Sequence, residues 1–304
     1  MKKTDIVIIG AGPAGITAAI YAQMDKAGYI LIEEKEPCWF LKESINSHYY
    51  ANGFPGISKK ITGTNLQQSF LDHYKRIGGK ILKDRVLKIS KINQQFKVKT
   101  TKNEFLCKAI IITSGTTPKL LDILGSKIYQ KQIHHFCTID GKKYIGKNIA
   151  VIGGRNSGAV AACYLHDIGC KVSIIEVQNE LQCKTKYKKQ LLKRNIKIYT
   201  STVVKKFAGK NKKLNQIVAE QNDKKIKIPA SGIFLYIGIK PALEYCNFKF
   251  KTNEQGFLII DEYNQTSQKN IFAAGDITCK LKQAITACGD GANAYYFADK
   301  MINN

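Results

Sequence analysis

Two glycine-rich segments of the chain have residue types and spacing that can hold a dinucleotide. The first, GAGPAG at Gly10 to Gly15, follows the apolar run DIVIIG and opens a helix of small residues. Gly10 allows a tight strand-to-helix turn, Gly12 lets the backbone approach a pyrophosphate, and Gly15 lets helix and strand pack closely. Glu33 stands 23 residues after Gly10, where a carboxylate can accept hydrogen bonds from a ribose diol. This spacing predicts a complete dinucleotide-binding start.

A second segment repeats the spacing but not the full motif. GGRNSG begins at Gly153, and Glu176 again stands 23 residues after the first glycine. Arg155 replaces the middle glycine, so its side chain should collide with a pyrophosphate unless it swings outward and neutralises the phosphates. Glu176 would repel a 2′-phosphate, which argues against NADPH and leaves NADH open. The second domain either binds a nicotinamide nucleotide or is kept only as scaffold. The residues that would form the nucleotide site are Gly153, Gly154, Arg155, Ser157 and Glu176.

The patterns around the two turns predict the elements that position them. Each turn is expected to open a βαβ unit, and KILKDRVLKIS, FKVKT and EFLCKAIIITSG are expected to form a β-meander that leads into a buried strand. We therefore predict an α/β protein with two Rossmann-like, three-layer dinucleotide-binding domains. Residues 1–116 and 243–304 form the discontinuous first domain, and residues 117–242 form the inserted second domain.

The C-terminal segment adds a carboxylate and a helix end to the first domain. IFAAGD places Asp276 at the end of a buried strand, and a helix with free N–H groups is expected to start at Lys282 to Ala284. A helix N-terminus stabilises negative charge. In a flavin enzyme that charge is the reduced isoalloxazine, and Asp276 would hydrogen-bond a ribityl hydroxyl.

Composition limits the compartment and the partners. Nine cysteines without close repeats indicate a reducing compartment and no metal site, and the absence of a run of about 20 apolar residues argues against a membrane span. Asp5 and the glycine turn argue against a secretory signal after Met1, so we expect a cytoplasmic protein.

The net charge of +25 comes almost entirely from lysine, since only four arginines occur. It reflects either coding bias or an acidic partner; no nucleic-acid motif stands out.

Together, GAGPAG, Glu33, the GFPG turn, TSG, the second glycine turn, IFAAGD and KQAIT resemble the low-molecular-weight thioredoxin reductases, class II of the pyridine nucleotide-disulfide oxidoreductases. The resemblance covers essentially the whole chain. It implies an FAD domain built from both chain ends, an inserted nicotinamide-type domain and a homodimer. The residues it places at FAD are Gly10, Gly12, Pro13, Ala14, Gly15, Glu33, Glu34, Asp276, Gln283 and Ala284.

Two hallmarks of that family are missing. Relatives carry CxxC-Asp-Gly before the second glycine turn, whereas this chain reads HHFCTIDG, with Phe136 and Ile139 at the cysteine positions and Cys137 alone between them. A flavin passes two electrons to a disulfide through such a vicinal dithiol, so that relay cannot run here. NADPH-specific relatives also carry a basic cluster after the second domain's strand, where this chain has Glu176-Val177-Gln178.

The remaining candidates for chemistry each have two interpretations. Cys137 is either a thiol that reacts with a substrate or with flavin, or a small buried side chain. Asp140, at the position of the family's acid, either delivers a proton or caps the Asp-Gly turn. His134 and His135 could titrate near neutrality, but a loop pair of this kind is usually solvated. Aromatic residues of the irregular segment could shield the flavin, namely Trp39, Phe40, His48, Tyr49 and Tyr50.

These features predict an FAD-dependent oxidoreductase of the thioredoxin reductase fold that lacks the redox dithiol and does not depend on NADPH. Its electrons would come from an acidic carrier such as ferredoxin or flavodoxin, or from NADH, and would pass to an unidentified acceptor. One alternative is a thiol or disulfide reductase that acts through Cys137 alone. The other is a flavin-binding sensor module without catalytic turnover.

Overall fold

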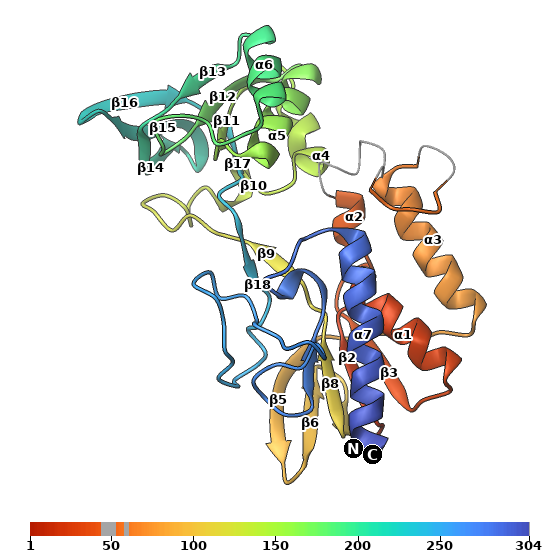
Figure 1. Ribbon diagram of the computed structural model, residues 1–304. Coiled ribbons are helices and arrows are strands. Elements are labelled where there is room, and N and C mark those ends of the chain that lie inside the picture. The colour runs from red at the N-terminus through yellow and green to blue at the C-terminus, as the bar shows by residue number, and fades with distance from the viewer. Residues whose placement is uncertain (44–52, 58–60, 304) are drawn as a thin grey trace. The chain divides into compact units, whose positions relative to one another are not determined.

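The computed structural model describes residues 1–43, 53–57 and 61–303 (Figure 1). The chain divides into two compact units. The first contains both chain ends, up to Thr117 and from Lys240, and the second is formed mainly by Pro118–Ile239. These boundaries lie one and three residues from the expected limits of 117 and 242.

The first unit is built on a five-stranded parallel sheet in the order β19-β8-β2-β3-β4. The central strands are continuous apolar runs buried on both faces, as is usual for parallel sheets. The strands of this sheet are β2 (Ile6–Ile9), β3 (Tyr29–Glu33), β4 (Ile81–Lys83), β8 (Ala109–Ile112) and β19 (Ile271–Ala273).

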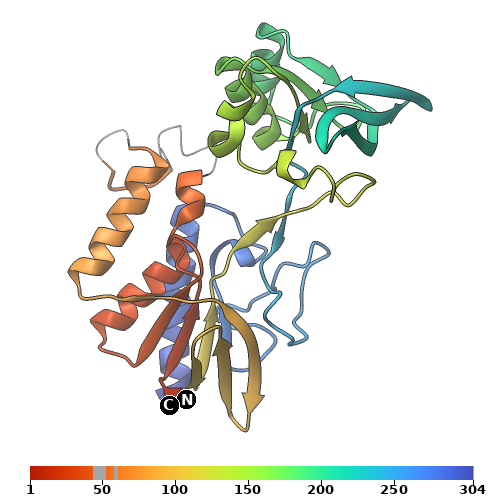
Figure 2. The same cartoon turned by 180° about the vertical axis from the view of Figure 1, so that it is seen from behind.

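Helices cover one face of this sheet and a second sheet covers the other, so the first unit has three layers (Figures 1 and 2). The helical layer contains α1 (Pro13–Met24), α2 (Trp39–Glu43), α3 (Gly63–Arg76), the 3₁₀ turn η4 (Gly275–Ile277) and α7 (Ala284–Asn303). The second sheet has the order β1-β7-β6-β5 and contains β1 (Lys2–Lys3), β5 (Val86–Ile92), β6 (Gln95–Thr100) and β7 (Glu104–Cys107).

The second unit repeats this three-layer plan. Its parallel sheet has the order β10-β17-β11-β12-β13, with helices packed on one face and the antiparallel sheet β14-β15-β16 on the other. Its strands are β10 (Ile133–His134), β11 (Asn148–Ile152), β12 (Lys171–Ile175), β13 (Lys197–Tyr199), β14 (Thr202–Lys210), β15 (Lys213–Gln221), β16 (Lys224–Pro229) and β17 (Gly232–Leu235). Its helices are η2 (Gln130–Gln132), α4 (Cys137–Asp140), η3 (Gly141–Tyr144), α5 (Asn156–Asp167) and α6 (Thr185–Lys193). The chain segments that enter and leave this unit pair as β9 (Thr116–Pro118) and β18 (Ile239–Pro241).

The α/β class with two Rossmann-like domains is confirmed, but the expected meander is wrong in one strand. KILKDRVLKIS splits into β4, which joins the parallel sheet, and β5, which joins the antiparallel sheet. The chain changes sheets at Asp84, whose buried carboxylate accepts hydrogen bonds from Thr100, at 2.6 Å, and from Thr101. A buried carboxylate needs hydrogen-bond donors, and those of Asp84 are hydroxyl groups of residues that follow it by 16 and 17 positions in the sequence.

Candidate functional site

The first glycine turn provides open space where a pyrophosphate would lie. Gly10 has φ +104°, and a Cβ atom there would lie 2.5 Å from the Thr113 carbonyl oxygen. A Cβ on Gly15 would lie 1.8 Å from the Gly10 carbonyl oxygen, so both glycines are required by the fold itself. A Cβ on Gly12, in contrast, would meet nothing within 4 Å. The absence of a side chain at Gly12 therefore leaves room at the N-terminus of α1, which fits a dinucleotide phosphate.

The Glu33 carboxylate is fixed beside the glycine turn by two backbone hydrogen bonds. Its Oε2 atom accepts a hydrogen bond from the Ala11 N–H at 2.7 Å, and its Oε1 atom accepts one from the Lys35 N–H at 2.9 Å. Each carboxylate oxygen can accept a further bond. Glu34 is exposed and has a different partner, because its carboxylate lies 3.6 Å from Nε of Arg85. The structure thus brings Glu33, but not Glu34, to the glycine turn.

The C-terminal segment reaches the same turn. Gly275 has φ +77°, and a Cβ there would lie 3.0 Å from Cβ of Ala14, while a Cβ on Gly291 of α7 would lie 2.1 Å from the Ala14 carbonyl oxygen. These close approaches place η4 and α7 against the start of α1. Asp276 is half-buried, and its carboxylate has no hydrogen-bond partner among the residues that the structure describes. Burial raises the pKa of Asp276, and the Lys282 ammonium opposes this shift.

The C-terminal helix starts at the last residue of the range expected for it. Helix α7 begins at Ala284, and the Gln283 N–H donates to the Leu281 carbonyl oxygen at 3.1 Å and lies 3.3 Å from Oγ1 of Thr286. Acceptance of this N–H by the hydroxyl of Thr286, the third residue of the helix, is a capping contact at the helix start. The N–H group of Gln283 is therefore not free, contrary to expectation, and its side chain is exposed.

The second glycine turn has the same backbone geometry as the first. Gly153 has φ +110°, and a Cβ on Gly158 would lie 1.9 Å from the Gly153 carbonyl oxygen. Glu176 is only 7% exposed; its Oε2 accepts the Gly154 N–H at 2.6 Å and its Oε1 accepts the Gln178 N–H at 3.0 Å. These are the bonds that Glu33 makes in the first unit.

Arg155 occupies the backbone position of Gly12 without strain. Its φ and ψ are −79° and −179°, against −75° and −177° for Gly12, and any residue adopts such extended angles. Arg155 and Ser157 are both exposed. The backbone of the turn therefore accommodates arginine without strain.

Cys137 is buried and has no neighbouring thiol in α4. It begins that helix at 1% exposure, and its N–H donates to the Tyr236 hydroxyl oxygen at 3.2 Å. Burial raises the pKa of the Cys137 thiol to about 11. Ile139, at the other family cysteine position, is 49% exposed, and none of the nine cysteines forms a disulfide. The thiolate form that reacts is therefore scarce at neutral pH.

Asp140 is part of a hydrogen-bonded chain. Its Oδ2 lies 3.0 Å from Nδ1 of His134, its Oδ1 accepts from the Lys143 ammonium at 2.5 Å, and Nε2 of His134 lies 2.8 Å from the Tyr144 hydroxyl. His134 is 9% exposed, so the expectation of a solvated histidine is wrong for it. Burial lowers the pKa of His134, while Asp140 opposes the shift. No sequence pattern signals this chain of contacts, because the pairing of β10 with β17 is what buries His134.

Trp39 and Phe40 lie on α2, where their rings are 5.6 Å apart and the Lys35 ammonium lies 4.4 Å from the Trp39 ring. The other three aromatic candidates, His48, Tyr49 and Tyr50, lie outside the described residues. Shielding of the flavin by this segment therefore stays a prediction.

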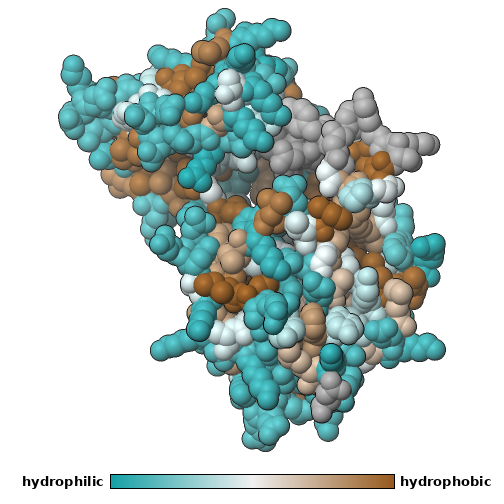
Figure 3. Space-filling model, in the orientation of Figure 1, coloured by the Kyte–Doolittle hydropathy of each residue, from teal (hydrophilic) through white to brown (hydrophobic). Residues whose placement is uncertain are grey.

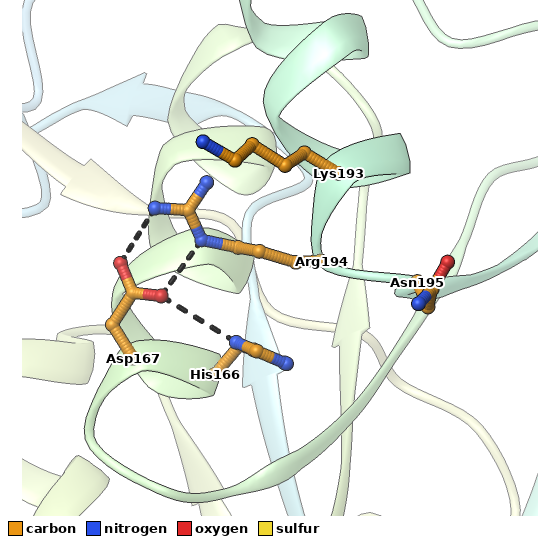
Figure 4. A pocket seen from close by; sticks show the side chains of 5 residues that line it. All are labelled: His166, Asp167, Lys193, Arg194 and Asn195. Atoms are coloured by element: carbon orange, nitrogen blue, oxygen red, sulfur yellow. Dashed lines mark hydrogen bonds and ion pairs between the residues drawn. The ribbon is translucent and has the colours of Figure 1, made fainter.

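One cavity of about 460 Å³ lies in the second unit, at the C-terminal ends of α5 and α6 (Figure 4). Arg194 donates to both carboxylate oxygens of Asp167 at 2.7 Å, and His166 lies 3.4 Å from the same carboxylate. Basic side chains at helix C-termini stabilise the helix dipole, so these contacts tie two helix ends together. The remaining lining residues are Lys193 and Asn195. The cavity lies at the opposite end of α5 from Arg155 and is not the nucleotide site.

The part of the chain that the structure describes contains no group of three or more side chains arranged to hold a metal ion. Within the same residues, no helix is both long and apolar enough to cross a membrane.

The model of the pyridine nucleotide-disulphide oxidoreductase family matches residues 4–291. The chain belongs to this family. Curated relatives include the 34.2 kDa protein in the rubredoxin operon of Clostridium pasteurianum, 33% identical over 99% of this chain and 98% of its own length. The thioredoxin reductase of Borreliella burgdorferi is 30% identical over 94% of this chain and 88% of its own length.

Solved structures agree with this assignment. The thioredoxin reductase of T. acidophilum has a TM-score of 0.87 and 29% identity over the whole of both chains, and that of Lactococcus lactis has 0.89 and 29% over 99% of both. This pyridine nucleotide-disulphide oxidoreductase is thus a thioredoxin reductase-like FAD flavoprotein. The family implies FAD and a nicotinamide cofactor, and the open turn at Gly12 beside Glu33 fits the first of these.

Proposed function

We propose that this protein is an FAD-dependent oxidoreductase that works without the redox dithiol of the thioredoxin reductases and takes its electrons from an acidic protein carrier. The observation that carries the proposal is the state of the CxxC position, where Cys137 is buried with a raised pKa and Ile139 replaces a second thiol. Without a vicinal thiol, no intramolecular disulfide can relay two electrons from that helix.

Both chain ends would hold FAD in the first unit. The N–H groups at the start of α1 beside Gly12 would face the pyrophosphate, and Glu33 would accept hydrogen bonds from the ribose diol. Asp276, whose carboxylate lacks a partner within the described residues, would accept a bond from a ribityl hydroxyl. FAD supplies the capacity to take up two electrons and release them singly or together.

The second glycine turn supports a nicotinamide nucleotide less well. The Cβ direction at Gly12 is the direction left open for phosphate, and Arg155 has the same backbone angles, so its side chain begins in the corresponding space. Any nicotinamide nucleotide that does bind would be NADH, because the buried Glu176 carboxylate would lie beside a 2′-phosphate. NADPH is not expected to serve as the donor.

A protein donor agrees with the charge of the chain and with one relative. The net charge of +25 attracts acidic partners at long range, and ferredoxins and flavodoxins are acidic. The Clostridium pasteurianum relative is named for its place in the operon of rubredoxin, which is itself an electron carrier. The proposal includes a homodimer in the cytoplasm.

An anaerobic titration of the FAD-loaded protein tests this function. NADH, NADPH and a chemically reduced ferredoxin are added to separate samples while flavin absorbance is followed. The proposal expects rapid and full bleaching by the ferredoxin, slower bleaching by NADH and none by NADPH on the same timescale. Rapid bleaching by NADPH would overturn the interpretation of the second turn. Failure of all three donors, with full bleaching by dithionite, would indicate a flavin-binding module.

A further inference from the structure

Positive charge is concentrated in the second unit. Between Pro118 and Ile239 there are 23 basic and seven acidic side chains, a net charge of +16 out of the +25 of the whole chain. This stretch is less than half of the sequence. Coding bias toward lysine would spread the charge evenly, so the uneven distribution indicates a surface that meets negative charge.

Part of this excess of basic side chains lies on the antiparallel sheet β14-β15-β16. Its three strands and their turns carry eight lysines and two acidic residues, and all eight lysines are exposed. The lysines of this sheet are Lys205, Lys206, Lys210, Lys212, Lys213, Lys224, Lys225 and Lys227. Figure 3 shows hydrophilic residues over most of this part of the surface.

Strand register separates the two faces of the sheet. Phe207, Ile217 and Ile228 are paired across the strands and buried in the core of the unit. On the opposite face Val218 lies between Lys206 of β14 and Lys227 of β16, because residues paired across strands share a face. We call the face of the sheet that carries Lys206, Val218 and Lys227 the lysine face.

The lysine face has little internal neutralisation. Lys225 and Val203 both pair in register with Glu220, whose carboxylate lies 3.5 Å from the Lys205 ammonium. Lys206, Lys225 and Lys227 form no ion pair within the described residues. Val203 is 40% exposed among them and provides a small apolar contact.

We propose that the lysine face binds the acidic electron carrier, an inference that rests on the proposed function. Small apolar contacts ringed by charge are typical of transient electron-transfer interfaces, which are small and formed by electrostatic steering. A nucleic acid is the poorer match. The segment 202–229 contains no arginine, and its single aromatic residue, Phe207, is buried, so base stacking and bidentate phosphate contacts are not available.

Charge reversal on the lysine face tests this inference against a matched control. The test variant is Lys206→Glu, Lys225→Glu and Lys227→Glu, and the control is Lys88→Glu, Lys91→Glu and Lys99→Glu on exposed strand positions of β5 and β6. Each changes the net charge equally. Equal FAD content and melting temperature establish that both variants fold.

Binding of a recombinant acidic ferredoxin to the FAD-loaded protein is measured at several ionic strengths. The affinity of the test variant should fall at least about tenfold at low salt and its salt dependence should weaken, while the control should change less than about threefold. Equal losses in both variants, or no loss in either, would overturn the docking surface. The docking surface would also be overturned if the test variant lost binding to a single-stranded DNA oligonucleotide while its ferredoxin binding stayed unchanged.

The rate of flavin reduction separates this inference from the proposed function. If ferredoxin reduces the flavin of the wild type and of the test variant equally fast, the function stands and the lysine face is wrong. If ferredoxin binds to the lysine face but never reduces the flavin, the surface stands and the proposed donor is wrong.

Discussion

The imidazole of His134 meets the carboxylate of Asp140 at 3.0 Å between Nδ1 and Oδ2. The Tyr144 hydroxyl occupies the other ring nitrogen and the Lys143 ammonium the other carboxylate oxygen, so every polar atom of the two side chains already has a partner. The residue at the family's acid position thus pairs with His134, and this contact ties α4 to β10. The Asp140 side chain does not cap the Asp-Gly turn, and proton delivery by its carboxyl group stays a prediction.

This pair predicts a pH-dependent stability. Burial lowers the pKa of His134 below its ordinary value of 6.5, so the unfolded chain binds a proton more readily than the folded one. The part of the free energy of unfolding that depends on neutral His134 is therefore fully present above pH 6.5. It is lost as the pH falls from 6.5 through the lowered pKa of the folded state. Each tenfold difference in proton affinity between the unfolded and folded chain is worth about 1.4 kcal/mol. His135 acts in the same direction through its own burial, which lowers its pKa.

His134→Gln should reduce the fall in melting temperature between pH 7 and pH 5.5, because it removes the titrating ring. The measurement is a thermal melt at each pH, with His73→Gln on the exposed side of α3 as the matched control. An unchanged pH profile in His134→Gln, or an equal change in His73→Gln, would contradict the assignment.

Two glycines of the first turn should separate folding from FAD binding. Gly15→Ala would place a Cβ 1.8 Å from the Gly10 carbonyl oxygen and should cost about 3 kcal/mol of stability with or without FAD. Gly12→Ala meets no protein atom and should leave the apoprotein stable, while FAD affinity falls at least about tenfold. Denaturant unfolding and FAD titration of each variant make the comparison. Equal FAD affinity in Gly12→Ala and the wild type would show that phosphate does not lie at that turn.

Arg155→Gly should open the second turn. The substitution clears the space that Gly12 leaves open in the first unit, and the extended backbone angles require no adjustment. We expect NADH affinity to rise at least about tenfold, while NADPH stays weak because Glu176 is unchanged. Isothermal titration with each nucleotide measures this. A loss of NADH affinity would instead show that the Arg155 guanidinium binds the pyrophosphate.

Cys137→Ala should leave turnover unchanged within about twofold, because a buried thiol with a pKa of about 11 supplies almost no thiolate at pH 7. The assay is ferredoxin-driven flavin turnover together with reduction of a small disulfide. Cys163→Ala, at another buried cysteine of the same unit, controls for packing loss. Abolished disulfide reduction in Cys137→Ala alone would support a single-cysteine reductase.

The repeated turns were predictable because their requirements are local. A strand, a glycine with positive φ and a helix lie within a few residues, and the carboxylate follows at a fixed distance set by one helix and one strand. Glu33 and Glu176 therefore have equivalent backbone partners in the structure. Glu34, which the family resemblance places at FAD, follows the last residue of β3, and the alternation of side chains there leaves it exposed beside Arg85.

The sequence by itself determined the α/β class, the two dinucleotide-binding starts, the loss of CxxC and the excess of lysine. Tertiary structure decided where the excess lysine is exposed, which partner His134 finds and that Arg155 fits the backbone of a glycine. Each of these depends on strands and helices that are distant in sequence and meet only in the fold. The register of β14-β15-β16 places lysines on one face of that sheet. The pairing of β10 with β17 buries His134, which then contacts Asp140 instead of solvent.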